Sequence, residues 1–279
     1  MILNGKELSN IIKNDLKKEV ENLKSTHAFN YKLATILVGN NSSSKTYVKM
    51  KEKACREIGL DFVLVHMEEN SSTKEVLKKI DELNKNNDIC GILLQHPVPK
   101  HIDETQCFNA ILETKDVDGV NTNNLGKLFI NLPCFVPATP LGIMLLLEHY
   151  SIVLEGKNAV VVGRSQILGK PVASMLLNKN ATVTIAHSKT LNLEEILKKA
   201  DIVVACVGKP NFIKPNNLKK GVIIIDAGYN EGNIGDVDKI NINEVASYYT
   251  PVPGGVGPMT IAALLIQTVK SAKSMILKK

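Results

Sequence analysis

The spacing of apolar residues predicts that helices and strands alternate along the chain. Runs with apolar residues every three or four positions alternate with short, unbroken apolar runs that end at glycine or polar residues. In the first part of the chain, the predicted helices cover residues 6–23, 44–59 and 73–84, and the predicted strands cover residues 33–38, 61–66 and 89–94. Such alternation favours a parallel sheet with helices on its faces, which is the α/β class.

The same pattern returns after a helix predicted at residues 141–150. Strands are predicted at residues 158–163, 182–186, 201–207 and 222–225. Helices are predicted after Pro171 as far as Leu177, at residues 193–199, and from Pro258 to about Leu277. Strands that repeatedly end at glycine are typical of a Rossmann-type parallel sheet. We therefore expect two lobes, one of residues 1–139 completed by a C-terminal helix at 258–279 that packs back on it, and one of residues 140–257.

One lysine lies on the apolar face of the helix predicted at 44–59. Lys51 shares that face with Tyr47, Val48, Ala54, Cys55 and Ile58. An ammonium group held among apolar side chains loses hydration, so its pKa falls and it becomes a candidate general base. The alternative is a structural lysine whose stem lies along the core while its charge extends into water.

Polar residues follow the predicted strands of the first lobe. Gln95 and His96 come directly after one strand, at the end of the sheet where ligands bind in α/β folds. The loop at residues 115–120 contains two carboxylates beside a glycine, although an Asp/Gly loop is also an ordinary turn. We expect His96 to line a pocket rather than bind a metal, because no second ligand lies at a suitable spacing.

A glycine turn follows the first strand of the second lobe. Gly163, Arg164 and Ser165 precede a helix, as in dinucleotide-binding folds, but the glycine spacing departs from GxGxxG because Gly169 comes one position late. The next strand lacks the acidic residue that binds the ribose 2′-hydroxyl of NAD, and Ser188 follows it instead. Arg164 and Ser188 favour a 2′-phosphate, so we predict NADP.

A string of glycines and prolines precedes the last predicted helix, at residues 251–260. Closely spaced glycines let the backbone approach a flat ligand, and Pro258 suits the first turn of a helix. The alternative is an ordinary loop, because glycine and proline mark loops of every kind.

Composition narrows the possible partners. The 279 residues are 44% apolar with a net charge of +6, and the lysines are spread along many helices, which favours small anionic ligands over nucleic acid. The N-terminus lacks an apolar signal-peptide core, and no apolar run reaches the ~20 residues that span a bilayer. The five cysteines are scattered, which indicates reduced thiols and no metal site. We expect a soluble, cytoplasmic protein without a membrane partner.

These features together resemble the bifunctional methylenetetrahydrofolate dehydrogenase/methenyltetrahydrofolate cyclohydrolase family. The resemblance extends over nearly the whole chain and is most specific in residues 47–51, 91–95, 115–119 and 251–260. It implies an NADP-dependent homodimer that binds tetrahydrofolate derivatives between its lobes. The implied reactions are oxidation of 5,10-methylenetetrahydrofolate to the methenyl form and hydrolysis of that product to 10-formyltetrahydrofolate.

The resemblance also implies roles for individual residues of the first lobe. Lys51 would be the catalytic lysine, and Gln95 would hold and tune it. Tyr47 would stack on the pterin ring, and Asp118 would anchor the pterin edge. Two departures from the family pattern lie in this lobe: His96 replaces a usually apolar residue beside Gln95, and Ala138 replaces a common cysteine.

For the second lobe, the resemblance implies a nucleotide site and part of the substrate site. Gly163, Arg164 and Ser165 would bind the phosphates, and Ser188 would bind the ribose phosphate. The backbone of Tyr229 would lie at the nicotinamide end. The substrate would contact Pro253, Gly254 and Gly255. Tyr229 replaces a common isoleucine, which a main-chain contact would tolerate. Two alternatives remain open: a dehydrogenase alone, acting on a folate or a shikimate-type acid, and a binding module without chemistry.

Overall fold

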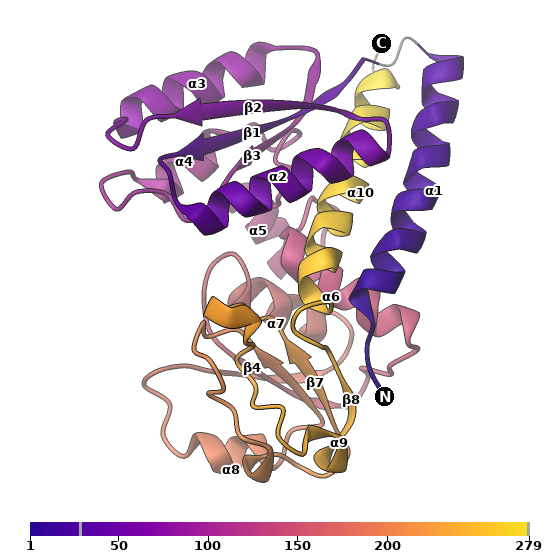
Figure 1. Ribbon diagram of the computed structural model, residues 1–279, viewed down its shortest axis with the longest axis vertical. Coiled ribbons are helices and arrows are strands. Elements are labelled where there is room, and N and C mark those ends of the chain that lie inside the picture. Colours follow the sequence, from indigo (N-terminus) through magenta and orange to yellow (C-terminus); the bar gives the residue numbers. More distant parts are fainter. Residues whose placement is uncertain (28–29, 278–279) are drawn as a thin grey trace. The chain divides into compact units, whose positions relative to one another are not determined.

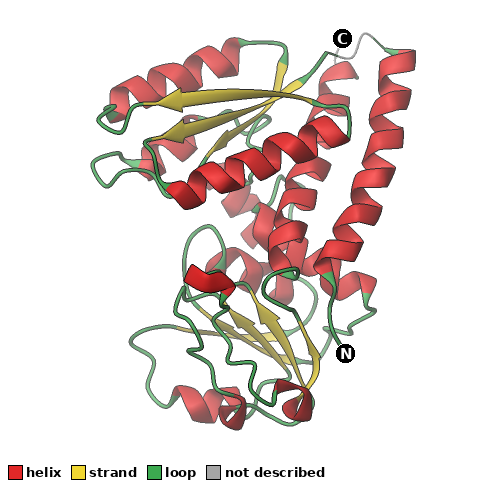
Figure 2. Ribbon diagram, viewed as in Figure 1, coloured by secondary structure: helices red, strands yellow, loops and turns green. Residues whose placement is uncertain are grey.

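The chain forms two compact units in a computed structural model that describes residues 1–27 and 30–277 (Figure 1). The five-stranded unit contains Met1–Asn10, Leu128–Leu132 and Thr139–Thr260, and the three-stranded unit contains Ile11–Lys127, Pro133–Ala138 and Ile261–Lys279. Two long helices, α1 (Gly5–Thr26) and α10 (Val256–Ile276), contribute residues to both units. In each unit the strands form one parallel sheet (Figure 2).

The sheet of the three-stranded unit has the order β2-β1-β3. Its strands are β1 (Lys32–Val38), β2 (Asp61–Met67) and β3 (Ile89–Leu94), and all pairings are parallel. The crossovers are α2 (Ser42–Glu57) and α3 (Thr73–Lys85). Every residue of β3 is buried, as expected for a strand that is apolar throughout. The predicted βαβ arrangement of this part of the chain is confirmed.

Helix α2 has well-defined ends and one buried face. The Asn41 side chain accepts a hydrogen bond from the Ser44 amide at 2.9 Å, and Gly59 follows the helix with a positive φ of 80°. The buried residues of the helix are Ser44, Val48, Lys51, Ala54 and Cys55. The predicted apolar face, including Lys51, is therefore confirmed.

The C-terminal part of α10 packs within the three-stranded unit, as predicted. The Gln267 amide nitrogen donates to the carbonyl oxygens of Val117 and Val136, and its oxygen accepts from the Val136 amide. Ser271 donates to the Cys90 carbonyl oxygen at 2.6 Å. Two short helices of this region, α4 (Glu104–Ala110) and α5 (Thr122–Phe129), were not predicted.

The sheet of the five-stranded unit has the order β5-β4-β6-β7-β8 and is also parallel. Its strands are β4 (Asn158–Val162), β5 (Thr182–Ala186), β6 (Ile202–Ala205), β7 (Val222–Asp226) and β8 (Ala246–Tyr249). Its helical elements are α6 (Ala138–His149), α7 (Gly169–Leu177), α8 (Leu193–Leu197), η1 (Pro215–Asn217), η2 (Glu231–Asn233) and α9 (Ile242–Val245). The doubly wound order around β4 and β6 confirms the predicted Rossmann-type sheet.

The N-terminal segment pairs with the edge strand of the five-stranded unit. Ile2 forms a parallel bridge with Tyr249, and the Leu3 amide donates to the Tyr249 carbonyl oxygen at 2.8 Å. The Lys6 amide donates to the Gly254 carbonyl oxygen, also at 2.8 Å. Because of these long-range backbone bonds, Met1–Asn10 belongs to the five-stranded unit, whose predicted lobe starts at residue 140.

Residues 1–27 and 30–277 contain neither a membrane-spanning helix nor a cluster of metal ligands. No helix in this part of the chain is both long enough and apolar enough to cross a membrane. No cluster of three or more His, Cys, Asp or Glu side chains within the same residues is arranged to hold a metal ion.

Candidate functional site

The Lys51 amine contacts the Gln95 side chain in the three-stranded unit. Lys51 lies on the buried face of α2, and Gln95 follows β3, where its amide donates to the Ile36 carbonyl oxygen of the neighbouring strand. Lys51 Nζ donates to Gln95 Oε1 at 2.9 Å, and both side chains are buried. Gln95 Nε2 donates to the His96 carbonyl oxygen at 2.6 Å, which fixes the side-chain amide with its oxygen toward the lysine.

Burial moves the Lys51 and Asp118 pKa values toward each other. Burial lowers the pKa of the Lys51 amine, and the nearby Asp118 carboxylate partly opposes that change. Burial raises the pKa of Asp118 to about 6, against the opposing effect of the Lys51 charge. A lysine and a carboxylate that titrate closer to neutrality are suited to proton transfer.

A second buried lysine in the same unit has a structural role. Lys115 Nζ donates to the backbone carbonyl oxygens of Leu83, Asn84 and Asn86, where α3 ends. Burial lowers the pKa of Lys115 as well, but three acceptors satisfy all three N–H donors of its ammonium group and oppose that change. The only side-chain hydrogen-bond acceptor described for Lys51 is Gln95, so Lys51 is the buried lysine suited to exchange a proton.

The two carboxylates of the loop at residues 115–120 differ in their burial and in their hydrogen bonds. Asp116 is fully buried and accepts hydrogen bonds from the Val120 and Asn121 amides and from the Asn124 side chain, so it shapes the loop. Asp118 is half-buried. The loop is therefore a turn that Asp116 organises, and the role of Asp118 in binding a ligand stays a prediction.

Tyr47 lies close to Lys51 along α2, and His96 follows Gln95, which contacts Lys51. Tyr47 is half-buried and precedes Lys51 by one helical turn on the same face of α2. The His96 ring is exposed and pairs with the Glu104 carboxylate at 2.5 Å, in the first turn of α4. His96 therefore reaches Gln95 through its main-chain carbonyl rather than its ring.

The glycine turn of the five-stranded unit requires two of its glycines. Gly163 follows β4 with a φ of 137°, and a Cβ there would lie 2.4 Å from the Cys206 carbonyl oxygen. A Cβ at Gly169, the first residue of α7, would lie 2.4 Å from the Gly163 carbonyl oxygen. Gly169 thus allows the close contact of helix and strand that the last glycine of the usual motif provides. The late glycine reflects a longer turn.

The remaining nucleotide candidates lie in the same unit. Arg164, Ser165 and Ser188 are exposed at the carboxyl ends of β4 and β5, and Ser165 Oγ accepts from the Gly169 amide at 3.3 Å. The Tyr229 hydroxyl donates to the Asn233 side chain at 2.5 Å, so its side chain is held within its own loop. A close backbone approach at the glycine turn and exposed cationic and hydroxyl groups fit a phosphate-bearing cofactor.

The Pro253, Gly254 and Gly255 candidates belong to the five-stranded unit, whereas Lys51, Gln95, Asp118 and Tyr47 belong to the three-stranded unit. Gly254 has a φ of 105°, and a Cβ at Gly255 would lie 2.6 Å from the Pro251 carbonyl oxygen. Both positions therefore need glycine. Each group of candidates lies within its own unit, and in the three-stranded unit Lys51 contacts Gln95.

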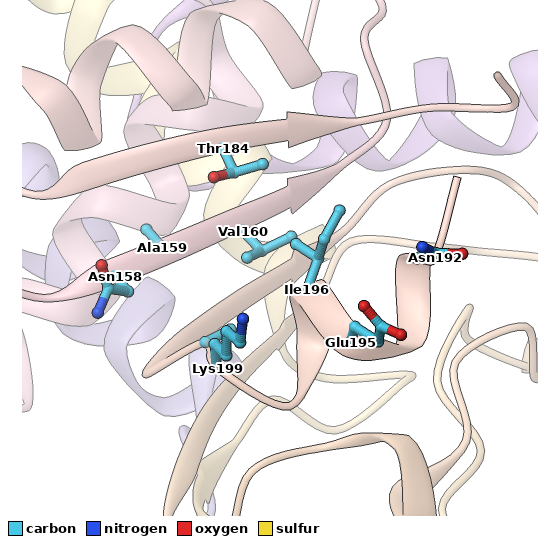
Figure 3. A pocket seen from close by; sticks show the side chains of 9 residues that line it. Asn158, Ala159, Val160, Thr184, Asn192, Glu195, Ile196 and Lys199 are labelled. Atoms are coloured by element: carbon cyan, nitrogen blue, oxygen red, sulfur yellow. The ribbon is translucent and has the colours of Figure 1, made fainter. Parts of the chain in front are cut away.

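A cavity of about 300 Å³ in the five-stranded unit contains none of the predicted site residues (Figure 3). Its lining comes from β4, β5 and the α8 region and comprises Asn158, Ala159, Val160, Thr184, Asn192, Glu195, Ile196, Lys199 and Ala200. Asn158 begins β4, whereas Gly163 follows that strand, so the cavity lies away from the glycine turn.

The sequence interpretation missed residues that support these sites. Gln267 holds the carbonyl oxygen of Val117, next to Asp118, but it lies about 150 positions later in the chain, and no local pattern marks it. Asp226 and Asp236 are buried carboxylates of the five-stranded unit that bind loop amides. A polar residue at the end of an apolar strand was the available signal for Asp226.

Comparisons with known proteins identify the family. Residues 3–118 match the catalytic domain of tetrahydrofolate dehydrogenase/cyclohydrolase, and residues 137–276 match its NAD(P)-binding domain. Bifunctional protein FolD of Leptospira interrogans is 52% identical over 273 residues, which are 98% of this chain and 96% of that protein.

Solved structures agree with this match. The bifunctional enzyme FolD, methylenetetrahydrofolate dehydrogenase/cyclohydrolase, from Campylobacter jejuni superposes with a TM-score of 0.95 at 46% identity, covering 98% of this chain and 99% of that chain. The dehydrogenase-cyclohydrolase of Trypanosoma brucei, solved with NADP cofactor and inhibitor, has a TM-score of 0.95 at 32% identity and covers 98% and 97%. The chain belongs to the tetrahydrofolate dehydrogenase/cyclohydrolase family, as its motifs predict.

Proposed function

We propose that this protein catalyses two successive reactions of a folate-bound one-carbon unit. The first is the NADP-dependent oxidation of 5,10-methylenetetrahydrofolate to 5,10-methenyltetrahydrofolate, and the second is the hydrolysis of that product to 10-formyltetrahydrofolate. The two matched domains of the family support this assignment. The observation that carries it is the 2.9 Å hydrogen bond between Lys51 Nζ and Gln95 Oε1 in a buried setting.

Lys51 acts as the general base of the hydrolysis. A neutral amine can donate one N–H to Gln95 Oε1 and still offer its lone pair to a water molecule. As the water oxygen bonds to the cationic methenyl carbon, one water proton passes to Lys51 and the electron pair of the C=N bond returns to nitrogen. The bond from that carbon to N5 then breaks as the new hydroxyl group becomes the formyl oxygen, and the hydroxyl proton goes to N5. Burial lowers the pKa of Lys51, which increases the fraction of neutral amine at a given pH.

Gln95, Asp118 and Tyr47 position the lysine and the folate. Gln95 holds the lysine from the end of β3, and its own orientation is fixed by the His96 carbonyl oxygen. The Asp118 carboxylate, once ionised, accepts paired N–H donors from the pterin edge. Tyr47, one turn from Lys51, supplies an aromatic face for the pterin ring.

The nucleotide residues of the proposed site are Gly163, Arg164, Ser165, Ser188 and Tyr229. Bound NADP supplies the hydride acceptor for the oxidation. Arg164 and Ser188 provide the charge and the hydroxyl group for a 2′-phosphate, and Gly163 lets the backbone approach the pyrophosphate. Pro253, Gly254 and Gly255 are proposed to bind the substrate through their backbone. The family resemblance further suggests a cytoplasmic homodimer serving purine, methionine and histidine biosynthesis.

Two assays of the purified protein test this function. With methylenetetrahydrofolate, the protein should reduce NADP, and with methenyltetrahydrofolate, it should accelerate hydrolysis without any nucleotide. Reduction of NADP without accelerated hydrolysis would leave a dehydrogenase alone. Binding of both ligands without either reaction would leave a binding module. Parallel measurements with NAD determine the cofactor preference.

A further inference from the structure

Two buried carboxylates lie at the carboxyl end of the five-stranded sheet. Asp226 is the last residue of β7 and is 2% exposed, and Asp236 lies ten residues later and is fully buried. No Lys or Arg side chain is described as bonded to either carboxylate, and their hydrogen bonds come from amide N–H groups. A buried carboxylate needs such donors to offset its lost hydration, so both side chains depend on the surrounding loops for their hydrogen bonds.

Asp236 binds three consecutive amides of the loop that follows β6. Its Oδ2 accepts from the Val207 and Gly208 amides at 2.6 and 2.9 Å, and its Oδ1 accepts from the Lys209 amide at 2.9 Å. The Asn230 side chain adds a bond to Oδ1 at 3.1 Å. One carboxylate therefore determines which way the backbone of residues 207–209 faces.

Asp226 in turn holds the segment that carries Asp236. Its Oδ1 accepts from the Asp236 amide at 2.9 Å, and its Oδ2 accepts from the Val237 amide at 3.0 Å. Oδ1 also accepts from the Gly228 amide, in the loop after β7. The rigid end of β7 thus positions Asp236, and Asp236 positions the loop after β6.

Two glycines make room for these carboxylates. A Cβ at Gly228 would lie 2.2 Å from Cγ of Asp236, and a Cβ at Gly235 would lie 1.9 Å from Oδ2 of Asp226. Neither glycine has a positive φ, so their lack of a side chain serves close packing rather than backbone conformation. Substitution at Gly228 is therefore an independent way to disturb Asp236.

The loop held by Asp236 borders the glycine turn. Ala205 at the end of β6 pairs with Val162 of β4 on one side and with Asp226 of β7 on the other. The next residue, Cys206, has its carbonyl oxygen against Gly163, where a Cβ would lie 2.4 Å away. Residues 207–209 follow directly and so lie next to the turn that is proposed to meet the pyrophosphate.

We infer that Asp236 is a positioning residue for the cofactor: it presets the loop at residues 207–209 beside the glycine turn before the nucleotide binds. This inference rests on the proposed nucleotide site at Gly163, Arg164 and Ser165. Asp236 acts through the backbone it holds and needs no contact with the cofactor. Its loss should therefore weaken nucleotide binding and spare the chemistry of the Lys51 unit.

The first test is the Asp236→Asn variant, which keeps the shape of the side chain but exchanges one acceptor for a donor that faces backbone N–H groups. The dissociation constant for NADP should rise about tenfold or more. The rate of methenyltetrahydrofolate hydrolysis, which uses no nucleotide, should stay within about twofold of the wild type, since a positioning effect is confined to the nucleotide.

The matched control is Asp238→Asn, two residues away. Asp238 bonds to Lys214 and to the Ile240 amide but to no amide of residues 207–209, so its NADP affinity should be that of the wild type. Equal NADP affinity in Asp236→Asn and the wild type would overturn the inference while leaving the proposed nucleotide site intact. A wild type that binds no NADP would instead remove the proposed site, and the inference with it.

If the Asp236→Asn variant does not fold, a measurement on the wild type still tests the inference. In the wild type without nucleotide, hydrogen exchange at the amides of Val207, Gly208 and Lys209 should already be slow. Exchange at the rate of an unstructured peptide, slowed only when NADP is added, would overturn the preset loop. Gly228→Ala should weaken NADP binding in the same way as Asp236→Asn, and unaltered NADP binding would count against the inference.

Discussion

Lys51 Nζ and Gln95 Oε1 lie 2.9 Å apart, although the two residues are 44 positions apart in the sequence. The contact joins a helix to the end of a neighbouring strand, and the bond from Gln95 Nε2 to the His96 carbonyl oxygen prevents the side-chain amide from turning over. A buried amine is thereby held by a neutral acceptor, which leaves its protonation free to change. A carboxylate at the same place would hold the proton on the lysine.

Lys51→Met should lower the rate of methenyltetrahydrofolate hydrolysis by a factor of about 100 or more, because general-base catalysis contributes roughly 10² to 10⁴. NADP affinity should not change, since Lys51 lies in the other unit from the proposed nucleotide residues. Steady-state hydrolysis and nucleotide titration are the measurements. Lys49→Met, an exposed lysine on the same helix, is the control and should keep full activity. Hydrolysis at the wild-type rate in Lys51→Met would refute the assigned base.

Gln95→Glu should shift the acidic limb of the hydrolysis pH profile to higher pH. A carboxylate beside Lys51 Nζ stabilises the ammonium form, so a higher pH is needed to obtain the neutral base. Activity at neutral pH should fall in consequence. Gln106→Glu adds the same charge at an exposed position of α4 and should leave the profile in place. A profile for Gln95→Glu that coincides with the wild type would show that Gln95 does not tune the lysine.

Folate binding should weaken as the pH falls through about 6. Burial raises the pKa of Asp118 to about 6, so the carboxylate is ionised above that pH and protonated below it. Only the ionised form accepts two N–H bonds from the pterin edge, so the KM for folate should rise about tenfold for each pH unit below the pKa. Asp118→Asn should show a high KM with little dependence on pH. A wild-type KM that stays constant between about pH 5 and 8 would exclude Asp118 as the proposed pterin anchor.

Gly169→Ala should destabilise the protein, and Gly126→Ala should not. A Cβ at Gly169 would lie 2.4 Å from a backbone oxygen, so a loss of about 1–3 kcal/mol in the free energy of unfolding is expected, together with weaker NADP binding. Gly126 lies within α5, and apart from its own helix backbone and chain neighbours nothing lies within 4 Å of its Cβ position. Alanine there should add about 0.5–1 kcal/mol to the free energy of unfolding. Chemical denaturation measures both. Equal stability of the two variants would contradict the close helix–strand contact.

The elements that could be predicted from the sequence are those in which the spacing of apolar residues follows directly from the burial of one face. The strand at residues 33–38 and the Lys51 face of α2 are long and regular, so local spacing identified them. Strand β8 has four residues, and its partner at Ile2 lies far away in the sequence, so no local pattern could indicate that pairing. Short helices such as α4 are similarly fixed by tertiary contacts and caps rather than by an apolar repeat.

The site was predictable where burial follows from helix geometry and unpredictable where it depends on hydrogen-bond partners. Lys51 and Lys115 both look like lysines near apolar residues, and only their acceptors distinguish them: one glutamine oxygen for Lys51 and three carbonyl oxygens at the end of α3 for Lys115. Asp116 and Asp118 likewise stand two positions apart in one turn. Their different roles depend on Asn121 and Asn124, which the sequence did not indicate.

The interleaved composition of the two units limits how this protein can be divided. The three-stranded unit needs the stretches Ile11–Lys127, Pro133–Ala138 and Ile261–Lys279, so no single continuous gene fragment encodes it whole. A fragment that stops before residue 261 would keep Lys51, Gln95 and Asp118 yet lack the Gln267 bonds to Val117 and Val136. Recombination that exchanges one catalytic activity for another must therefore transfer the distant segment Ile261–Lys279 as well.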